Sequence, residues 1–143
     1  MALIDFGIYF MSYLRMRALM RKKMAIGIKP LEEFKEYTIA IAKGEIKPRA
    51  GDPKIWFDSI ESVLQILSTK NQTLLRIIEE QKPNSLAKLA EVSGRQRSNL
   101  NRTLKRLEKY GIVSLKKENK FVRPQVRVNI FNIKIDNRVK AAS

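Results

Sequence analysis

Residues 85 to 113 decide the fold of this chain, and they have the sequence SLAKLAEVSGRQRSNLNRTLKRLEKYGIV. Ser85 suits an N-cap position, and apolar side chains follow it at helical spacing, which predicts a short helix. Gly94 then predicts a turn, because glycine adopts a left-handed backbone conformation without strain. A second helix should follow, since Leu100, Leu104 and Leu107 form one apolar stripe. With a strand beginning at residue 112, this order is typical of a helix-turn-helix that leads into a wing.

Polar and basic side chains crowd the turn and the first part of the second helix: Arg95, Gln96, Arg97, Ser98, Asn99 and Arg102. In a helix-turn-helix this end of the second helix enters the major groove. Arginine pairs in bidentate fashion with guanine, asparagine and glutamine pair with adenine, and serine suits phosphate oxygens. We therefore predict that these residues contact bases and nearby phosphates. Taken alone, they would fit a solvated helix face about equally well.

The distribution of charge favours the nucleic-acid interpretation. Residues 85 to 128 contain twelve basic and three acidic side chains, a net charge of +9 out of +15 for the whole chain. Residues 24 to 53 and residues 54 to 84 each have a net charge of zero. A positive surplus that coincides with a groove-binding element indicates a nucleic-acid binder.

Two short apolar strands joined by a polar turn are predicted after the second helix, and they would form the wing. The basic side chains of this hairpin are expected beside phosphates or the minor groove: Lys116, Lys117, Lys120 and Arg123. Lys105 and Arg106 of the helix are expected to contact the DNA backbone as well. The alternative is a solvated hairpin, for which lysines are ordinary. Pro124 cannot donate to a strand ladder, so it should lie at an edge or a bulge.

The chain contains no cysteine and no histidine. The first absence excludes disulfides and thiolate zinc sites. The second removes the usual general base and most transition-metal sites. We therefore expect no enzyme activity and no cofactor.

Residues 1 to 23 form a separate N-terminal extension with a mostly apolar first half. Its basic residues follow the apolar run, which is the reverse of a secretory signal, and the run is too short to span a bilayer. Three interpretations stay open. The segment is an amphipathic helix for a partner or a membrane surface, an extra helix of the fold, or an upstream extension before a true start at Met24.

Residues 24 to 53 are expected to form an N-terminal arm, a helix and a linker. Residues 24 to 28 suit a short strand or an extended arm. The helix should begin at Pro30, which suits the first helical position, and end at Lys43 and Gly44, and it either packs on the core or forms a dimer or partner interface. Residues 44 to 53, with two glycines and two prolines, have the composition of a linker.

Residues 54 to 136 are expected to form the DNA-binding domain, and residues 137 to 143 a tail. A strand around Trp56 comes first, with the tryptophan as a core or dimer anchor. A helix should follow with Asp58 as its N-cap and Glu61 completing a capping box. The next helix is capped by Ser68 or Thr69, and the apolar residues after 126 predict one or two further strands.

The segment from Gly94 to Val113 resembles the MarR-type winged helix-turn-helix family. The matching residues are Ser98-Asn99-Leu100-Asn101-Arg102, then Leu104-Lys105-Arg106-Leu107-Glu108, then Gly111-Ile112-Val113. A closer resemblance is to small prokaryotic MarR-like DNA-binding proteins, carried by Ile26-Gly27-Ile28, residues 37 to 45, residues 53 to 57 and Ser93-Gly94-Arg95. It covers about residues 24 to 135. That group looks like antitoxins encoded beside TumE-type toxins, which implies a dimeric repressor that also neutralises a toxin protein.

The sequence thus predicts a mainly α, α+β protein with a small β-wing, a winged helix-turn-helix. We expect a cytoplasmic, sequence-specific regulator of transcription that binds double-stranded DNA as a homodimer, acts as an autoregulating repressor, and has no stable membrane insertion. Two rivals stay open. One is an RNA- or ribosome-associated basic protein, and the other is a winged-helix protein-interaction module that uses residues 1 to 23 as a docking helix.

Overall fold

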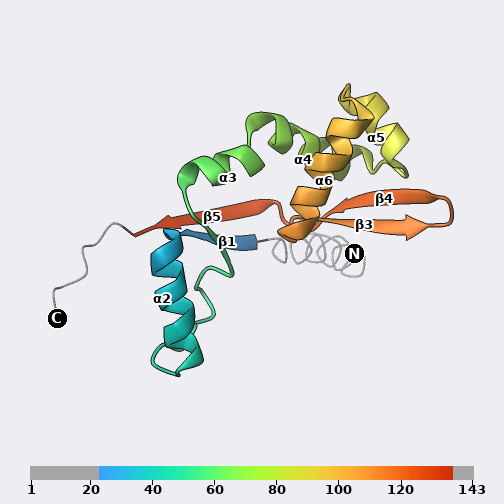
Figure 1. The fold of residues 1–143 in the computed structure, drawn as a ribbon. Helices are drawn as coiled ribbons and strands as arrows, with labels where there is room; N and C mark the ends of the chain where they lie inside the picture. Colours follow the sequence, from blue (N-terminus) through green and yellow to red (C-terminus); the bar gives the residue numbers. More distant parts are fainter. Residues whose placement is uncertain (1–22, 137–143) are drawn as a thin grey trace, which may run out of the picture.

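The computed structural model describes residues 23 to 136. The interpretations of residues 1 to 23 as a helix or an extension, and of residues 137 to 143 as a tail, lie outside the described residues, except that Lys23 belongs to the first strand and not to the extension. The described part has an α+β fold with five helices and five strands, which confirms the predicted class (Figure 1). In chain order these are β1 (Lys23–Ile28), α2 (Leu31–Ala42), β2 (Ile55–Phe57), α3 (Ile60–Ile66), α4 (Thr69–Gln81), α5 (Leu86–Ser93), α6 (Arg97–Lys109), β3 (Val113–Glu118), β4 (Phe121–Val126) and β5 (Ile130–Ile135).

A three-stranded parallel sheet joins the two ends of the described chain. Its order is β2-β1-β5, so β1 is the central strand. Ile26 pairs with Ile55 on one side and with Ile133 on the other, and its side chain is only 1% exposed. The segment expected as a strand or an arm is therefore a core strand. It shares one sheet with both ends of the region expected to form the DNA-binding domain.

The helices α4, α5 and α6 pack around a core of leucine and isoleucine side chains. Leu89 of α5 is fully buried, as are the three leucines that form the stripe of α6. Leu74 and Ile78 of α4 belong to the same cluster. No one of these helices is long enough to be stable alone, so their mutual burial holds the unit together.

The helix ends follow local chemistry that was visible in the sequence, with one correction. The Ser85 hydroxyl accepts a hydrogen bond from the backbone N–H of Lys88, and Gly94 ends α5 with a φ of 70°, as predicted. The predicted N-cap at Asp58 is wrong. Ser59 caps α3 by accepting from the Ser62 N–H, while Asp58 accepts a hydrogen bond from the Ser62 hydroxyl. That bond lowers the pKa of the Asp58 carboxyl below its usual value.

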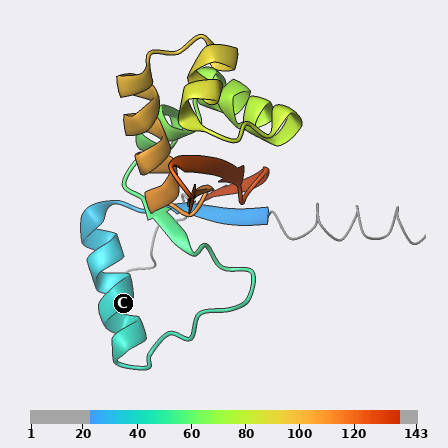
Figure 2. The ribbon, with the colours of Figure 1, turned by 90° about the vertical axis from the view of Figure 1, so that its right-hand side faces the viewer.

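Helix α2 stands apart from the body of the protein (Figures 1 and 2). It contains no buried residue, so the alternative in which it packs on the core is wrong. Its link to the sheet is aromatic: the rings of Tyr37 and Trp56 lie 5.3 Å apart, and the Lys29 ammonium lies over both. The Trp56 ring in turn lies over Gly27 of β1, where the absence of a side chain makes room for it.

We predict that Gly27→Ala destabilises the protein by about 1–3 kcal/mol, the usual range for overpacking. The added Cβ would overlap the Trp56 ring, which Tyr37 and Lys29 hold in place. Gly51→Ala is the matched control, because the Cβ would meet open space there. Urea unfolding measures both variants, and equal stabilities would contradict the packing of Trp56 on Gly27.

Candidate nucleic-acid interface

The position of α6 is set by its buried side. Leu100, Leu104 and Leu107 are all fully buried, and residues 94 to 96 form the short connection from α5. Since a helix has 3.6 residues per turn, burial of this stripe fixes which side chains point away from the core. The helix begins at Arg97, and its N-cap, Gln96, makes no side-chain capping bond.

The side of α6 opposite the leucines is a basic stripe. Ser98, Arg102, Lys105 and Lys109 follow each other at intervals of four, three and four, which places them on one face, and all four are exposed. Asn99 and Arg106 are exposed beside this stripe. We did not single out Lys109 from the sequence, although the same periodicity would have found it.

Gln96 and Arg97 are exposed at the start of α6. The first backbone N–H groups of a helix have no partner within the helix, and the helix dipole adds positive potential there. An anion such as a phosphate group is therefore favoured at this end.

Arg95 differs from the predicted contact residues that follow it in α6. Its side chain is partly buried, and its Nη1 donates to the Asn71 Oδ1 of α4 at 3.1 Å. The Asn71 amide donates in turn to the Ile66 carbonyl oxygen at 2.9 Å. Arg95 thus ties the turn before α6 to the start of α4.

The hairpin of β3 and β4 extends beyond the helices (Figure 1). Asn119 and Lys120 form its turn, and Asn119 has a φ of 53°, a conformation that asparagine tolerates better than most residues. Pro124 lies inside β4 and is fully buried, in a sheet of two strands where each strand has an edge. This agrees with the predicted edge position.

Like charges face each other across this hairpin. Lys116 is directly opposite Arg123, and the two share one face of the two-stranded sheet. Such a pair destabilises a sheet unless an anion lies between the charges. Lys117 belongs to the other face, opposite Val122, and Lys120 lies in the turn. The four predicted basic residues of the hairpin therefore do not form a single row.

The tip of the hairpin also carries Phe121, which is 60% exposed. The sequence suggested only an ordinary apolar strand residue at this position. The register shows why it is exposed: Phe121 pairs with Glu118 at the end of the ladder, on the face that carries Lys116 and Arg123. The core-facing side of the hairpin is instead formed by Val113, Pro124 and Val126, which are buried.

Two further findings concern the part of the chain between residues 23 and 136. That part of the chain contains no cluster of histidine, cysteine, aspartate or glutamate suited to hold a metal ion. None of its helices has the length and hydrophobicity of a membrane-spanning segment.

Comparison with known proteins adds one similarity. A family described as HVO_A0114 matches residues 66 to 133, slightly less than half of the chain. The matched region begins at the end of α3 and includes α4, α5, α6, the hairpin and most of β5. No curated protein and no solved structure matches the chain significantly. The resemblance to MarR-type proteins stays a prediction.

We predict that Arg95→Ala lowers the free energy of unfolding by about 1.5–3 kcal/mol, the range for a hydrogen bond to a charged group. Asn71→Ala should also be destabilising. The two effects should be less than additive, because both variants remove the same hydrogen bond between Arg95 and Asn71. Arg97→Ala is the control, since its side chain is exposed and should change stability by at most about 0.5 kcal/mol. A double-mutant cycle by urea unfolding tests this, and a coupling energy of zero would contradict the role of Arg95 as a tie.

Proposed function

We propose that the protein is a sequence-specific double-stranded DNA-binding protein of the winged helix-turn-helix type, which regulates transcription. The observation that carries the proposal is the two-sided character of α6. One side is a fully buried leucine stripe, and the other is an exposed stripe of Ser98, Arg102, Lys105 and Lys109. A helix that is fixed by its buried side and exposes basic and amide side chains on the opposite side suits insertion into a major groove.

The order of elements supports the winged form. Two helices joined by a short turn are followed directly by an antiparallel hairpin, in the order α5, α6, β3 and β4. In winged helix-turn-helix proteins the second helix enters the major groove, and the hairpin lies along the neighbouring backbone. The family similarity covers this whole set of elements but describes no activity or ligand.

The side chains of α6 have different roles in this proposal. Ser98, Asn99 and Arg102 lie in its first two turns, where they would contact base edges and nearby phosphates. Lys105, Arg106 and Lys109 lie farther along the helix and would contact the phosphate backbone. Arg95 acts mainly on the position of α6, through its bond to Asn71.

The hairpin would supply a second set of contacts. A phosphate between Lys116 and Arg123 would relieve the repulsion between these opposed cations. Phe121 lies one pair farther along the same face, at the tip of the hairpin. An exposed aromatic side chain beside a basic strand pair suits the minor groove, where proteins insert apolar side chains.

The finer biological role rests on the resemblance to MarR-like antitoxins. It includes the autoregulating repressor, the cytoplasmic location and a cognate toxin as partner. Homodimerisation on a palindromic operator is the usual arrangement for helix-turn-helix proteins. Suppression of the lethality of a toxin encoded beside this protein would test the antitoxin role, and failure to suppress it would count against that role.

We predict that the full-length protein prefers its own promoter DNA to scrambled DNA by at least about a thousandfold at roughly 150 mM salt. Arg102→Ala should weaken binding to the promoter by about 5- to 150-fold, because it removes a bidentate contact worth about 1–3 kcal/mol. Its binding to scrambled DNA should change much less. Gel shifts measure both affinities.

Lys43→Ala is the control for that experiment, because it removes one exposed charge just after α2, far along the chain from α6. It should leave the preference for the promoter unchanged. Equal binding of the unmodified protein to both DNAs would overturn sequence-specific recognition and favour the RNA or interaction alternatives.

We predict that Lys116→Gln has opposite effects on folding and on DNA binding. It should stabilise the free protein by about 0.2–1 kcal/mol, because it removes the repulsion with Arg123. It should weaken DNA binding and lower the slope of log affinity against log salt by about one. Thermal unfolding and a salt titration of binding give the two readouts.

Glu118→Gln is the control for the hairpin experiment, since Glu118 lies at the end of the same strand and carries the other charge. It should not lower the salt slope. If Lys116→Gln left both the salt slope and the affinity unchanged, Lys116 would not contact phosphate.

A further inference from the structure

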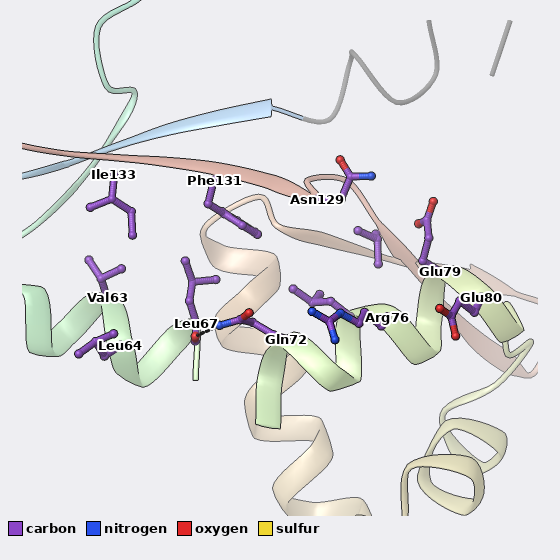
Figure 3. A pocket seen from close by; sticks show the side chains of 12 residues that line it. Val63, Leu64, Leu67, Gln72, Arg76, Glu79, Glu80, Asn129, Phe131 and Ile133 are labelled. Carbon is purple, nitrogen blue, oxygen red and sulfur yellow. Dashed lines mark hydrogen bonds between the residues drawn. The ribbon is translucent and has the colours of Figure 1, made fainter. Parts of the chain in front are cut away.

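An open apolar groove lies between β5 and the helices α3 and α4. Its volume is about 510 Å³, and its apolar lining includes Val63, Leu64, Leu67, Phe131 and Ile133. Figure 3 shows Phe131 and Ile133 pointing from β5 toward the side chains of α3 and its C-cap. Ile133 is in register with the buried Ile26, so both belong to the core-facing side of the sheet. Ile133 is nevertheless 42% exposed, because the helices do not cover the sheet at β5.

Strand β5 also leaves a backbone edge open. In the sheet order β2-β1-β5, its second edge pairs with no strand among residues 23 to 136. Natural edge strands are usually protected by proline, bulges or charged side chains. The sequence of β5, IFNIKI, contains no proline and one charged residue. That residue, Lys134, is in register with Gly27 on the outer face, and its Nζ donates to the Gly51 carbonyl oxygen at 2.9 Å.

The exposed apolar surface continues from the strand onto the helix layer. Leu64 of α3 is 58% exposed and lines the same groove as Ile133. Ile135, which is 54% exposed, follows on the core-facing side of β5. Monomeric proteins rarely expose a continuous patch of this kind beside an unpaired strand.

We propose that a second copy of this chain covers this surface. In this arrangement β5 pairs antiparallel with the partner's β5, and the two sheets become one six-stranded sheet. The inference deepens the proposed function and rests on it, because a two-fold dimer suits a palindromic DNA site only if the protein binds DNA. A two-fold axis through the joined sheets would present two copies of α6 to two half-sites.

Charge favours this surface for self-association. Each chain has a net charge of +15, so two copies repel each other wherever their basic faces meet. The groove is lined by one basic side chain, Arg76, and two acidic ones, Glu79 and Glu80. Residues 85 to 128, by contrast, have a net charge of +9. The β5 surface is therefore one on which two copies can approach with little repulsion.

The sequence of β5 favours one register. Core-facing residues must pair with core-facing residues, so the two-fold axis has to pass through a residue pair and not between pairs. With the axis at Ile133, Phe131 lies opposite the partner's Ile135, and Lys134 lies opposite the partner's Asn132. With the axis at Lys134, two ammonium groups would face each other, which is destabilising. With the axis at Asn132, Ile135 would lie opposite residue 129, which precedes the strand.

The first test is the oligomeric state of the full chain without DNA, measured by sedimentation equilibrium. We expect a dimer. Ile133→Lys places two charges at the two-fold axis and should raise the dimer dissociation constant by at least about 30-fold. Leu31→Lys is the matched comparison, because Leu31 is 59% exposed on α2, the other segment expected as a dimer interface, and it should leave a dimer formed through β5 intact. A monomeric wild-type protein, or a dimer that Ile133→Lys does not weaken, would overturn the proposal.

A cysteine scan tests the register and does not depend on the lysine variant folding. The chain contains no cysteine, so Ile133→Cys introduces a single thiol. Opposite residues of an antiparallel pair lie within disulfide distance, and mild oxidation should link most of the chains. Phe121→Cys, exposed at the tip of the hairpin, should form far less of the linked dimer. Equal linking of the two variants would overturn the register.

The proposed dimer and the proposed DNA-binding function can be overturned independently of each other. A monomeric wild-type protein that still prefers its promoter DNA would overturn the dimer alone. A dimer sensitive to Ile133→Lys that binds both DNAs equally would overturn the proposed function alone.

Discussion

Burial of the leucine stripe of α6 is the interaction on which the rest of the candidate site depends. Leu100, Leu104 and Leu107 are fully buried, and burial of each stabilises the fold by about 2 kcal/mol. This packing sets the rotation of α6 about its own axis, so that Arg102 and its neighbours in the basic stripe face solvent. The bond from Arg95 to Asn71 adds a polar tie between the turn and α4. A rigid helix of this kind is what specific contact with a groove requires.

The parallel sheet performs a different task, because it holds together segments that are far apart in sequence. Strand β1 lies between β2 and β5, and Ile26 at its centre is buried. The sheet is covered well around β1 but poorly at β5, which leaves both an open edge and an open groove. The surface we assign to a second copy and the basic surface of α6 belong to different parts of the fold. Association and DNA binding would therefore use separate residues.

Much of the fold and part of the candidate site followed from local patterns. The caps at Ser85 and Gly94, the leucine stripe and the hairpin depend on residues close in sequence, and the structure contains all of them. The prediction of Asp58 as a cap was wrong by one residue, since Ser59 lies nearer the first unpaired N–H groups. The partner of Arg95 and the exposure of Phe121 could not be predicted. They depend on a contact with α4 and on the pairing register of the hairpin.

The sequence by itself determined the elements and the sign of the charge on the segment that contains α6. Helix caps, apolar periodicity and charge counts are properties of neighbouring residues, so they need no knowledge of the rest of the chain. Only the tertiary structure decided that β1 is a central strand, that α2 packs on no core, and that β5 has an open edge. Parallel pairing joins strands that are about a hundred residues apart here, and no local pattern specifies which strands meet.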